Sequence, residues 1–409
     1  MASTPTGNCP ANAAWPYTGT RPRDPHLDSL RGLMLVIMTI AHSSSRLVTY
    51  VHYGLGFIGD AIGFVFLAGM SAGRTFGGPQ PLPPEKARRR LVRRALILWL
   101  VHAGLAALLL TIYALYRQQL AGYWPWRHLL RDDLLIAWLK YASLVYQTTL
   151  FDILPMYVVC LLATPLALAA FHRHRTGWVI AISTVLWATA QIAPDFQLLL
   201  RSASLSWLAL KPGQFNWLAW QLPYFLGLSF GYWHGRRPLP AFMHGRILLA
   251  LVIAIALALL ALGRAHAWAH SPITRAWLPD SLVLADALLH ALLADRLWNG
   301  KTVVAPLYLL NFAVLTYLVW RLTRRWPQLL CWRWLALLGR NSLAVFGFHI
   351  VLVFALAPVG KTLRGTTWTT QSIYTAAVVA SLTLPAWISD TVRRRRRERG
   401  APAATPVTN

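Results

Sequence analysis

The chain has 409 residues, of which 56% are hydrophobic and only 13% are charged, and its mean hydropathy is +0.46. Soluble domains carry about 25% charged residues, so the composition excludes an ordinary soluble protein and indicates an integral membrane protein. The formal net charge of +26 would suggest nucleic acid in a soluble protein. In a membrane protein basic residues gather on cytoplasmic loops as orientation signals, so no nucleic-acid partner is expected.

About ten segments are long and apolar enough to span a membrane, which takes about 20 mostly apolar residues. A further segment, 278–294, carries polar residues at helical spacing and is expected to be an interfacial or re-entrant helix. The sequence therefore predicts an all-α, polytopic membrane bundle of about ten transmembrane helices. In chain order the expected spans cover residues 27–46, 60–75, 91–116, 144–170, 178–193, 217–233, 247–263, 302–320, 334–357 and 372–388.

The distribution of Lys and Arg orients these spans. With a cytoplasmic N-terminus, the inside segments hold nearly twice as many basic residues as the outside segments. This distribution fits the positive-inside rule for an even number of spans with both termini in the cytoplasm. The expected parts are a disordered cytoplasmic tail over 1–23, a transmembrane domain over 24–391 and a basic cytoplasmic tail over 392–409.

Orientation accounts for most of the charge but not for the polar residues inside the spans. Asp28 and Arg31 are three residues apart and share a helix face, either as a pair that eases helix entry or as part of a site. Charge inside hydrocarbon is costly unless it is paired or used, so buried polar residues are candidates for a functional site. The remaining candidates are Asp60, at the outer entrance of the second span, and His42, Asp152, Arg340, Asn341 and His349.

Three titratable side chains from three spans are expected at a similar depth in the outer half of the membrane. At 1.5 Å per residue, His42 lies roughly 22 Å along the first span, His349 roughly 21 Å along the ninth, and Asp152 roughly 12 Å into the fourth from outside. A lone buried histidine is more often a hydrogen-bonded core residue. Convergence of the three favours a site in which a histidine is the general base and a carboxylate orients its other ring nitrogen.

Two further groups are candidates for binding substrates. The basic loop "EKARRRLVRR" contains Arg89, Arg90 and Arg93, which can bind the phosphates of a nucleotide-bearing donor or act as an orientation signal that also binds anionic lipid. Trp217 and Trp220 are candidates for stacking on a sugar ring, with lipid-facing packing as the alternative. The three cysteines show no metal-ligand spacing, so no metal is expected.

Five motifs occur in a fixed order along the chain: "RDPHLDSLRGLMLVIMTIAH", "GFIGDAIGFVFLAGMSAG", "FDILPMYVV", "FNWLAWQLPYFLGLSFG" and "LGRNSLAVFGFHIVLV". Together they resemble the OpgC family of membrane acyltransferases, which is distantly similar to the acyltransferase type-3 proteins and to lysosomal heparan acetyltransferase. The sequence departs from the family pattern at His26, Ala68 and Trp217, and none of these departures removes a titratable group.

The resemblance implies a bacterial inner-membrane enzyme that moves an acyl group, succinyl in the named member, from cytosolic acyl-CoA to sugar hydroxyls outside the membrane. It places the motif histidine on His42, the paired acid and base on Asp28 and Arg31, and the late histidine on His349. His42 then either deprotonates the sugar hydroxyl or carries the acyl group itself.

The same resemblance implies the partners. Succinyl-CoA or acetyl-CoA is the expected donor substrate, a periplasmic or cell-surface glucan is the expected acceptor, and no tightly bound cofactor is expected. Membrane lipids are further partners, and a homodimer is one possible assembly.

The residues themselves leave two other functions open. Buried charges also line transport paths, so a transporter or flippase for a glycan or lipid-linked sugar is the main alternative. Such a protein is expected to show related halves or broken helices at matching positions, and neither is visible in the sequence. A non-catalytic membrane scaffold has no need for His42. A membrane O-acyltransferase is therefore the function that the sequence favours.

Overall fold

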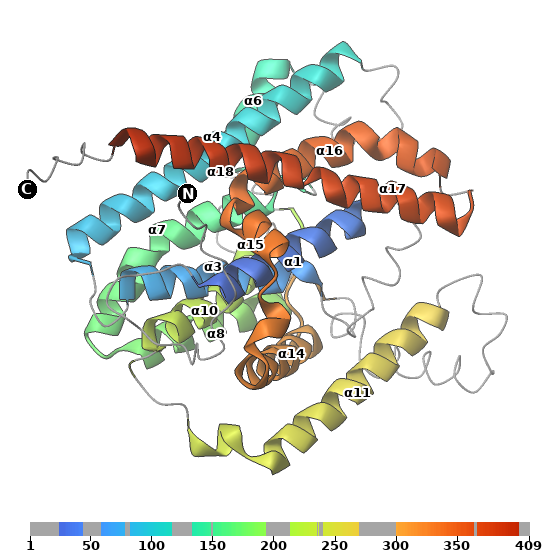
Figure 1. The fold of residues 1–409 in the computed structure, drawn as a ribbon. Coiled ribbons are helices and arrows are strands. Elements are labelled where there is room, and N and C mark those ends of the chain that lie inside the picture. Colours follow the sequence, from blue (N-terminus) through green and yellow to red (C-terminus); the bar gives the residue numbers. More distant parts are fainter. Residues whose placement is uncertain are drawn as a thin grey trace, which may run out of the picture.

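The structure is a computed structural model of the chain. It describes residues 24–43, 59–77, 82–116, 133–148, 150–193, 213–234, 236, 240–269, 300–363 and 366–400. These residues form a bundle of helices, which confirms the all-α fold class (Figure 1). The expected tail over 1–23 and the expected helix over 278–294 lie outside the described residues.

The helices follow the apolar segments of the sequence. Short η turns adjoin three of them: η1 (Gly73–Gly77) continues α3, η4 (Ala241–His244) precedes α11, and η6 (Pro327–Leu330) precedes α15. The α-helices are α1 (Pro25–His42), α3 (Asp60–Ala72), α4 (Pro84–Leu115), α6 (Leu134–Ala142), α7 (Ile153–His172), α8 (Thr176–Ile192), α10 (Trp217–Trp233), α11 (Arg246–Ala269), α14 (Pro306–Arg325), α15 (Arg333–Arg340), α16 (Ser342–Leu363), α17 (Trp368–Ser381) and α18 (Thr383–Gly400).

Polar caps begin several of these helices. The carboxylate of Asp24 accepts a hydrogen bond from the backbone N–H of His26 at 2.9 Å, and Pro25 occupies the first turn of α1. The side chain of Asn216 accepts from the backbone of Leu218 and begins α10 in the same way. These caps satisfy N–H groups that the first turn of a helix leaves without intrahelical partners.

Four helical stretches in the described part of the chain are long and apolar enough to cross a membrane: α4, α7, α11 and the continuous stretch from α17 into α18. The bent pair α15–α16 makes a fifth if it is counted as one span. Among the other predicted spans, α3 has only 13 residues and α8 has 17. These apolar helices support a membrane protein, whereas ten spans and two cytoplasmic termini stay predictions.

The ninth expected span is not a single straight helix. Residues 333–340 and 342–356 form two helices bent by 86° at Asn341. The Asn341 amide nitrogen donates to the carbonyl oxygen of Leu337, and its amide oxygen accepts from Arg393 of α18 at 2.6 Å. The basic segment that begins at 392 is therefore not only a tail, because α18 stays helical to Gly400 and braces this break.

Glycines set two close helix crossings in the centre of the bundle. Gly339 of α15 lies against the backbone of Asp28, and Gly32 of α1 lies against the backbone of Leu335, so a Cβ at either position would overlap a carbonyl oxygen. Small residues let helices in a membrane approach this closely. The crossing of α3 with α10 uses Gly69, Gly73, Gly227 and Gly231 in the same way. These glycines therefore serve close packing of the helices.

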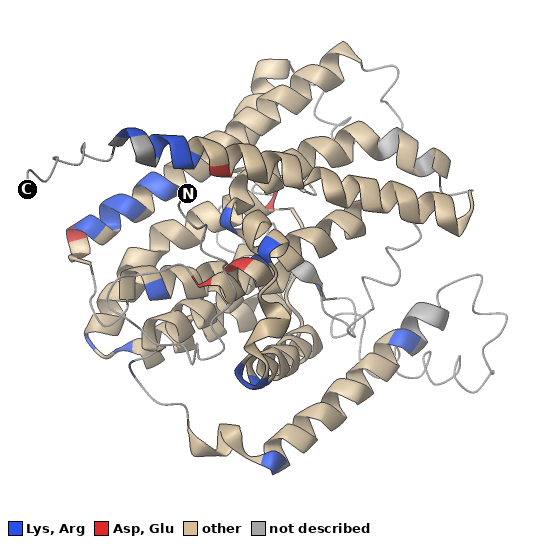
Figure 2. Ribbon diagram, in the orientation of Figure 1, with Lys and Arg blue, Asp and Glu red and all other residues tan. Residues whose placement is uncertain are grey.

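Charge and apolar surface are separated along the bundle. Lys and Arg gather at the N-terminal end of α4 and the C-terminal end of α18, both on the left of the view in Figure 2. The apolar helix α11 lies at the edge of the bundle and packs on α14 (Figure 1). Only 11% of the apolar stretch of α11 that is long enough to cross a membrane is buried, which is expected for a helix facing lipid.

Candidate active site

Two histidines from α1 and α16 are in direct contact. Nδ1 of His42 lies 3.1 Å from Nε2 of His349, and the two ring centroids are 5.3 Å apart. His349 is buried, with 1% of its surface exposed, whereas His42 is partly exposed. The structure thus brings together the two histidines that the sequence singles out, one buried and one partly exposed.

Thr39 extends this contact by bonding to the other ring nitrogen of His349. Its hydroxyl lies 3.1 Å from Nδ1 of His349 and donates to the carbonyl oxygen of Leu35 at 2.8 Å. Thr39 precedes His42 by three residues, so both side chains point from the same face of α1 toward α16. A continuous hydrogen-bonded row therefore runs from the backbone of α1 through Thr39 and His349 to His42.

Asp152 does not take the expected place beside His42. It is the N-cap residue of α7 and is 1% exposed. One of its carboxylate oxygens, Oδ2, accepts a hydrogen bond from the backbone N–H of Gln214 at 2.6 Å, and the other has no hydrogen-bond partner among the described residues. The depth predicted for Asp152 assumed a helix from Leu144, but α7 begins at Ile153 after a turn. The ring nitrogen of His42 that a carboxylate was expected to orient, Nδ1, contacts His349 instead.

Asp28 and Arg31 lie one turn apart near the start of α1. Nη1 of Arg31 is 3.8 Å from the Asp28 carboxylate, and Nη2 donates to the carbonyl oxygen of Leu67 at 3.1 Å. Both side chains are largely buried. The expected pair is therefore present, and the Arg31 guanidinium also bonds to the backbone of α3.

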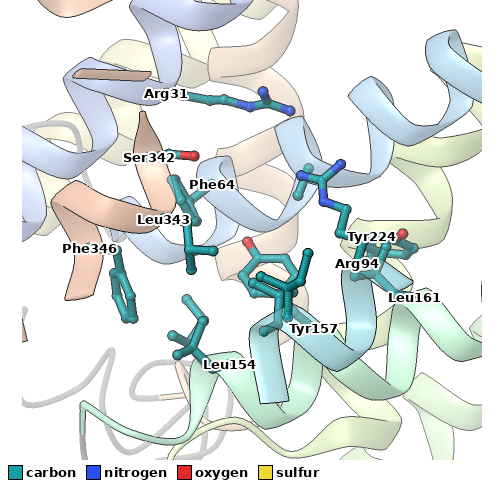
Figure 3. Close-up of a pocket in the computed structure, with 14 residues that line it drawn as sticks. Arg31, Phe64, Arg94, Leu154, Tyr157, Leu161, Tyr224, Ser342, Leu343 and Phe346 are labelled. Carbon is teal, nitrogen blue, oxygen red and sulfur yellow. The ribbon is translucent and has the colours of Figure 1, made fainter. Parts of the chain in front are cut away.

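The Arg31 side chain also lines a cavity of about 110 Å³ between six helices (Figure 3). The wall is mostly apolar and comes from α1, α3, α4, α7, α10 and α16. Its polar groups include the guanidinium groups of Arg31 and Arg94 and the hydroxyl of Tyr157, which face the same space in Figure 3. An apolar cavity with a few convergent polar groups is the usual form of a small-molecule site.

The polar lining of this cavity suits an anionic or carbonyl-bearing ligand. Tyr157 is 6% exposed, and its hydroxyl has no hydrogen-bond partner in the described structure. A buried hydroxyl without a partner costs about 1–3 kcal/mol, so a ligand that accepts its proton recovers this cost. Two guanidinium groups beside it provide positive charge for phosphate or carboxylate oxygens.

Phe346 connects the cavity to the histidine pair. Its side chain lines the cavity, and its ring centroid lies 6.3 Å from that of His349, one turn further along α16. At the other end of the cavity, Arg31 precedes His42 by 11 residues, which is about 16 Å along α1. A ligand with an anionic end at the arginines and a reactive end at His42 would have to be elongated.

The basic segment expected to bind donor phosphates is helical rather than a loop. Arg89, Arg90 and Arg93 lie in the first turns of α4 and are exposed, and Arg89 pairs with Glu85 at 3.5 Å. None of the three lines the cavity. The next residue, Arg94, lies one turn before Ile97 and Leu98 and shares their cavity-facing side of α4.

The structure gives two of the expected substrate-binding residues other roles. Trp220 is fully buried, and its indole N–H donates to the carbonyl oxygens of Lys301 and Thr302, so it offers no free face to a sugar. Asn341 is occupied by Arg393 at the helix break. Arg340 beside it contributes its carbonyl oxygen to the same arginine, at 3.4 Å. Asp60 is the first residue of α3, and its side chain lies outside the described part of the structure.

An ionic cluster fixes the start of α1, outside the expected span. The Asp24 carboxylate accepts a hydrogen bond from Nη1 of Arg74 at 2.6 Å, and Nε2 of His26 lies 2.8 Å from the carbonyl oxygen of Pro327. Burial opposes the charge on Asp24, but hydrogen bonds from His26 and Arg74 and the charge of Arg74 outweigh burial and lower the pKa of Asp24. The hydrogen bond to Asp24 in turn raises the pKa of His26.

Three residues of this site are not singled out by the sequence reasoning, although each carries a local signal. Thr39 shares a helix face with His42 at a spacing of three residues, and Arg94 aligns with apolar residues of α4 once that segment is treated as a helix. Tyr157 lies within the motif "FDILPMYVV". Their common role appears only when several helices are placed together.

Among the described residues, no group of three His, Cys, Asp or Glu side chains is arranged to hold a metal ion. No curated protein and no solved structure matches the chain significantly. A family model described as OpgC protein matches residues 23–394, which include both histidines and every residue lining the cavity. Because this match extends over nearly the whole chain, the protein belongs to the OpgC family, and this membership indicates a membrane-associated transferase that modifies glucans.

Proposed function

We propose that the protein transfers an acyl group from cytosolic acyl-CoA to a hydroxyl of a glucan on the outer side of the bacterial inner membrane, with His42 as the catalytic base. The observation that carries this proposal is the contact between the His42–His349 pair and the wall of the arginine-bearing cavity, through Phe346. Base and donor pocket are thereby adjacent within one helical bundle.

The reaction needs one proton acceptor and an enclosed thioester. The ring of His42 takes the proton of the sugar hydroxyl while the oxygen attacks the thioester carbonyl. A C–O bond forms, the C–S bond breaks, and the proton passes from His42 to the departing sulfur. Transfer through an acyl-His42 intermediate uses the same ring and gives the same products, a sugar ester and free CoA. A tightly packed bundle keeps water away from the thioester.

The lining of the cavity supports acyl-CoA as the donor. This molecule carries its phosphates and its thioester at opposite ends of a long pantetheine arm. Arg31 and Arg94 would bind the phosphates, and the apolar wall would enclose the arm on its way past Phe346 toward His42. The acyl group, succinyl or acetyl, and the glucan acceptor belong to this proposal.

The test is release of CoA by the purified protein incubated with succinyl-CoA or acetyl-CoA and a glucan. The wild type is expected to release CoA and to increase the mass of the glucan by one acyl group. His42→Gln, which keeps a polar side chain but no basic ring, is expected to lower the rate by about 10²–10⁴-fold, the usual contribution of a general base. His102→Gln is the control, because His102 is another histidine of the bundle, fully buried, whose ring bonds to the carbonyl oxygen of Tyr141 in α6 and not to the histidine pair.

Two outcomes would count against the proposal. Undiminished release of CoA by His42→Gln would show that His42 is not the catalytic base. An absence of release with either acyl-CoA would favour a glycan or lipid-linked sugar transporter, for which the 86° break between α15 and α16 is the one supporting feature in the described structure. Uptake of labelled glucan into vesicles that contain the protein would then test transport directly.

The arginine cavity has its own test. Arg94→Gln is expected to raise the KM for acyl-CoA by about tenfold with little change in kcat, because it removes a charge-assisted hydrogen bond made in the bound state. Arg89→Gln is the control, since Arg89 lies on the same helix but does not line the cavity and pairs with Glu85. Equal effects of the two substitutions would show that only the general positive charge of α4 matters.

A further inference from the structure

We propose that Thr39 and His349 are positioning residues that hold His42 in one tautomer, with the proton on Nδ1 and the lone pair on Nε2. This inference rests on the proposed function, because a fixed lone pair matters only if His42 acts as a base or nucleophile. It goes further by assigning each proton in the row that joins α1 to α16.

The assignment begins at a backbone carbonyl. The oxygen of Leu35 can only accept, so the single hydroxyl proton of Thr39 is directed to it, across 2.8 Å. The Thr39 oxygen then has only lone pairs to offer to Nδ1 of His349, at 3.1 Å. That nitrogen must therefore carry a proton and donate. Thr39 is fully buried, so bulk water does not compete for these positions.

The second step passes through the ring of His349. A neutral imidazole carries a proton on one nitrogen only, and here that nitrogen is Nδ1. Nε2 of His349 is then an acceptor, and it faces Nδ1 of His42 at 3.1 Å. Nδ1 of His42 must therefore donate. In neutral His42 this places the lone pair on Nε2, the nitrogen on the opposite side of the ring from His349.

The row also supports the charged state that follows proton transfer. When Nε2 of His42 takes a proton from a hydroxyl, the resulting imidazolium still donates from Nδ1 to His349. A hydrogen bond to a charged donor is stronger than one between neutral groups, so the contact tightens as the reaction proceeds. A buried histidine can thus take the part that a carboxylate plays in other hydrolytic and transfer sites, while burying no negative charge in the membrane.

Nitrogen NMR of protein labelled with ¹⁵N-histidine tests the assignment, because protonated and unprotonated ring nitrogens have well-separated shifts. The His42 signals are identified as those lost in His42→Gln. In the wild type and in Thr39→Ser, which keeps the hydroxyl, neutral His42 is expected to show a protonated Nδ1. In Thr39→Val, which has the same shape without the hydroxyl, a second population protonated on Nε2 is expected.

Kinetics provide the second readout. Thr39→Val is expected to lower kcat for acyl transfer by about tenfold, the effect of one lost hydrogen bond, with the KM for acyl-CoA unchanged. Thr39→Ser is expected to restore most of the rate. A purely structural role of Thr39 would alter thermal stability without changing the tautomer signals.

The inference is overturned if wild-type His42 is protonated on Nε2, or if Thr39→Val leaves both the tautomer and kcat unchanged. Because the NMR measurement needs no turnover, it separates this inference from the proposed function. A wild type that transfers no acyl group but shows the expected tautomer would refute the acyltransferase and leave the assignment of protons intact.

Discussion

The hydroxyl of Tyr157 gives the sharpest test of the donor cavity, because its removal should affect stability and binding in opposite directions. The side chain is 6% exposed and its hydroxyl has no partner among the described residues. Leaving such a group unsatisfied costs about 1–3 kcal/mol. Tyr157→Phe removes the unsatisfied hydroxyl while keeping the ring, so it should stabilise the ligand-free protein by about 1 kcal/mol. A Tm increase of about 2 °C or less follows for a chain of this size.

The same substitution should weaken binding of the donor. A hydroxyl that donates to a charged or carbonyl oxygen of the ligand contributes about 1.5 kcal/mol, so the KM for acyl-CoA should rise about tenfold. Tyr224→Phe is the matched control: it lines the same cavity, but its hydroxyl already pairs with Thr164 at 2.9 Å, and its loss should lower the Tm. Thermal unfolding in detergent and steady-state kinetics measure the two effects. A lower Tm for Tyr157→Phe together with an unchanged KM would refute a ligand at this hydroxyl.

Three other predictions concern the supports of the site. Asp152→Asn should lower the Tm yet leave the pH profile of transfer unchanged, because the Asp152 carboxylate bonds to the backbone of a neighbouring loop. A shifted pH profile would show that Asp152 takes part in the reaction. Gly339→Val should destabilise the fold by about 1–3 kcal/mol or more by separating α15 from α1, whereas Gly104→Val, with open space around it, should be tolerated much better. The lowered pKa of Asp24 contributes stability above about pH 4 that is lost on acidification, and the raised pKa of His26 contributes stability below about pH 6.5 that is lost as pH rises. The Tm should therefore be highest between these limits, and Asp24→Asn should flatten the dependence.

Much of the fold could be predicted from the sequence because hydrophobic periodicity and length determine where helices form in a membrane protein. The seventh expected span and α11 coincide closely, and both histidines of the site lie on the helices expected to carry them. The five motifs in family order also identified the family correctly. What the pattern could not supply is the angle between consecutive helices, because 334–357 reads as one apolar run.

The histidine pair therefore does not form for the reason that the sequence suggested, which was a similar depth of both residues along straight helices. The predicted depth of His349 assumes one straight helix over 334–357, but α16 begins at Ser342, only seven residues before His349. Its position depends on the break at Asn341 and on Arg393, which lies 52 residues further along the chain and binds there. A contact of this kind is set by tertiary packing and leaves no periodic signal. For the same reason Arg94 and Tyr157 are recognisable only after α4 and α7 are packed together.

The polar residues inside the bundle differ in how completely their hydrogen bonds are satisfied within the fold. The indole of Trp220 and the amide of Asn341 are used by neighbouring backbone and by Arg393, so they stabilise helix positions and have little left to offer a ligand. In hydrocarbon no water replaces a missing partner, so a buried polar group without one is costly and needs a reason. An unsatisfied atom alone is not sufficient evidence for a site, as one oxygen of Asp152 shows. Tyr157 is distinguished because its hydroxyl faces a cavity that also contains two guanidinium groups and adjoins a histidine pair with one accessible ring. Unsatisfied polarity and positive charge in one cavity, beside a histidine pair, are the combination that the proposed thioester donor requires.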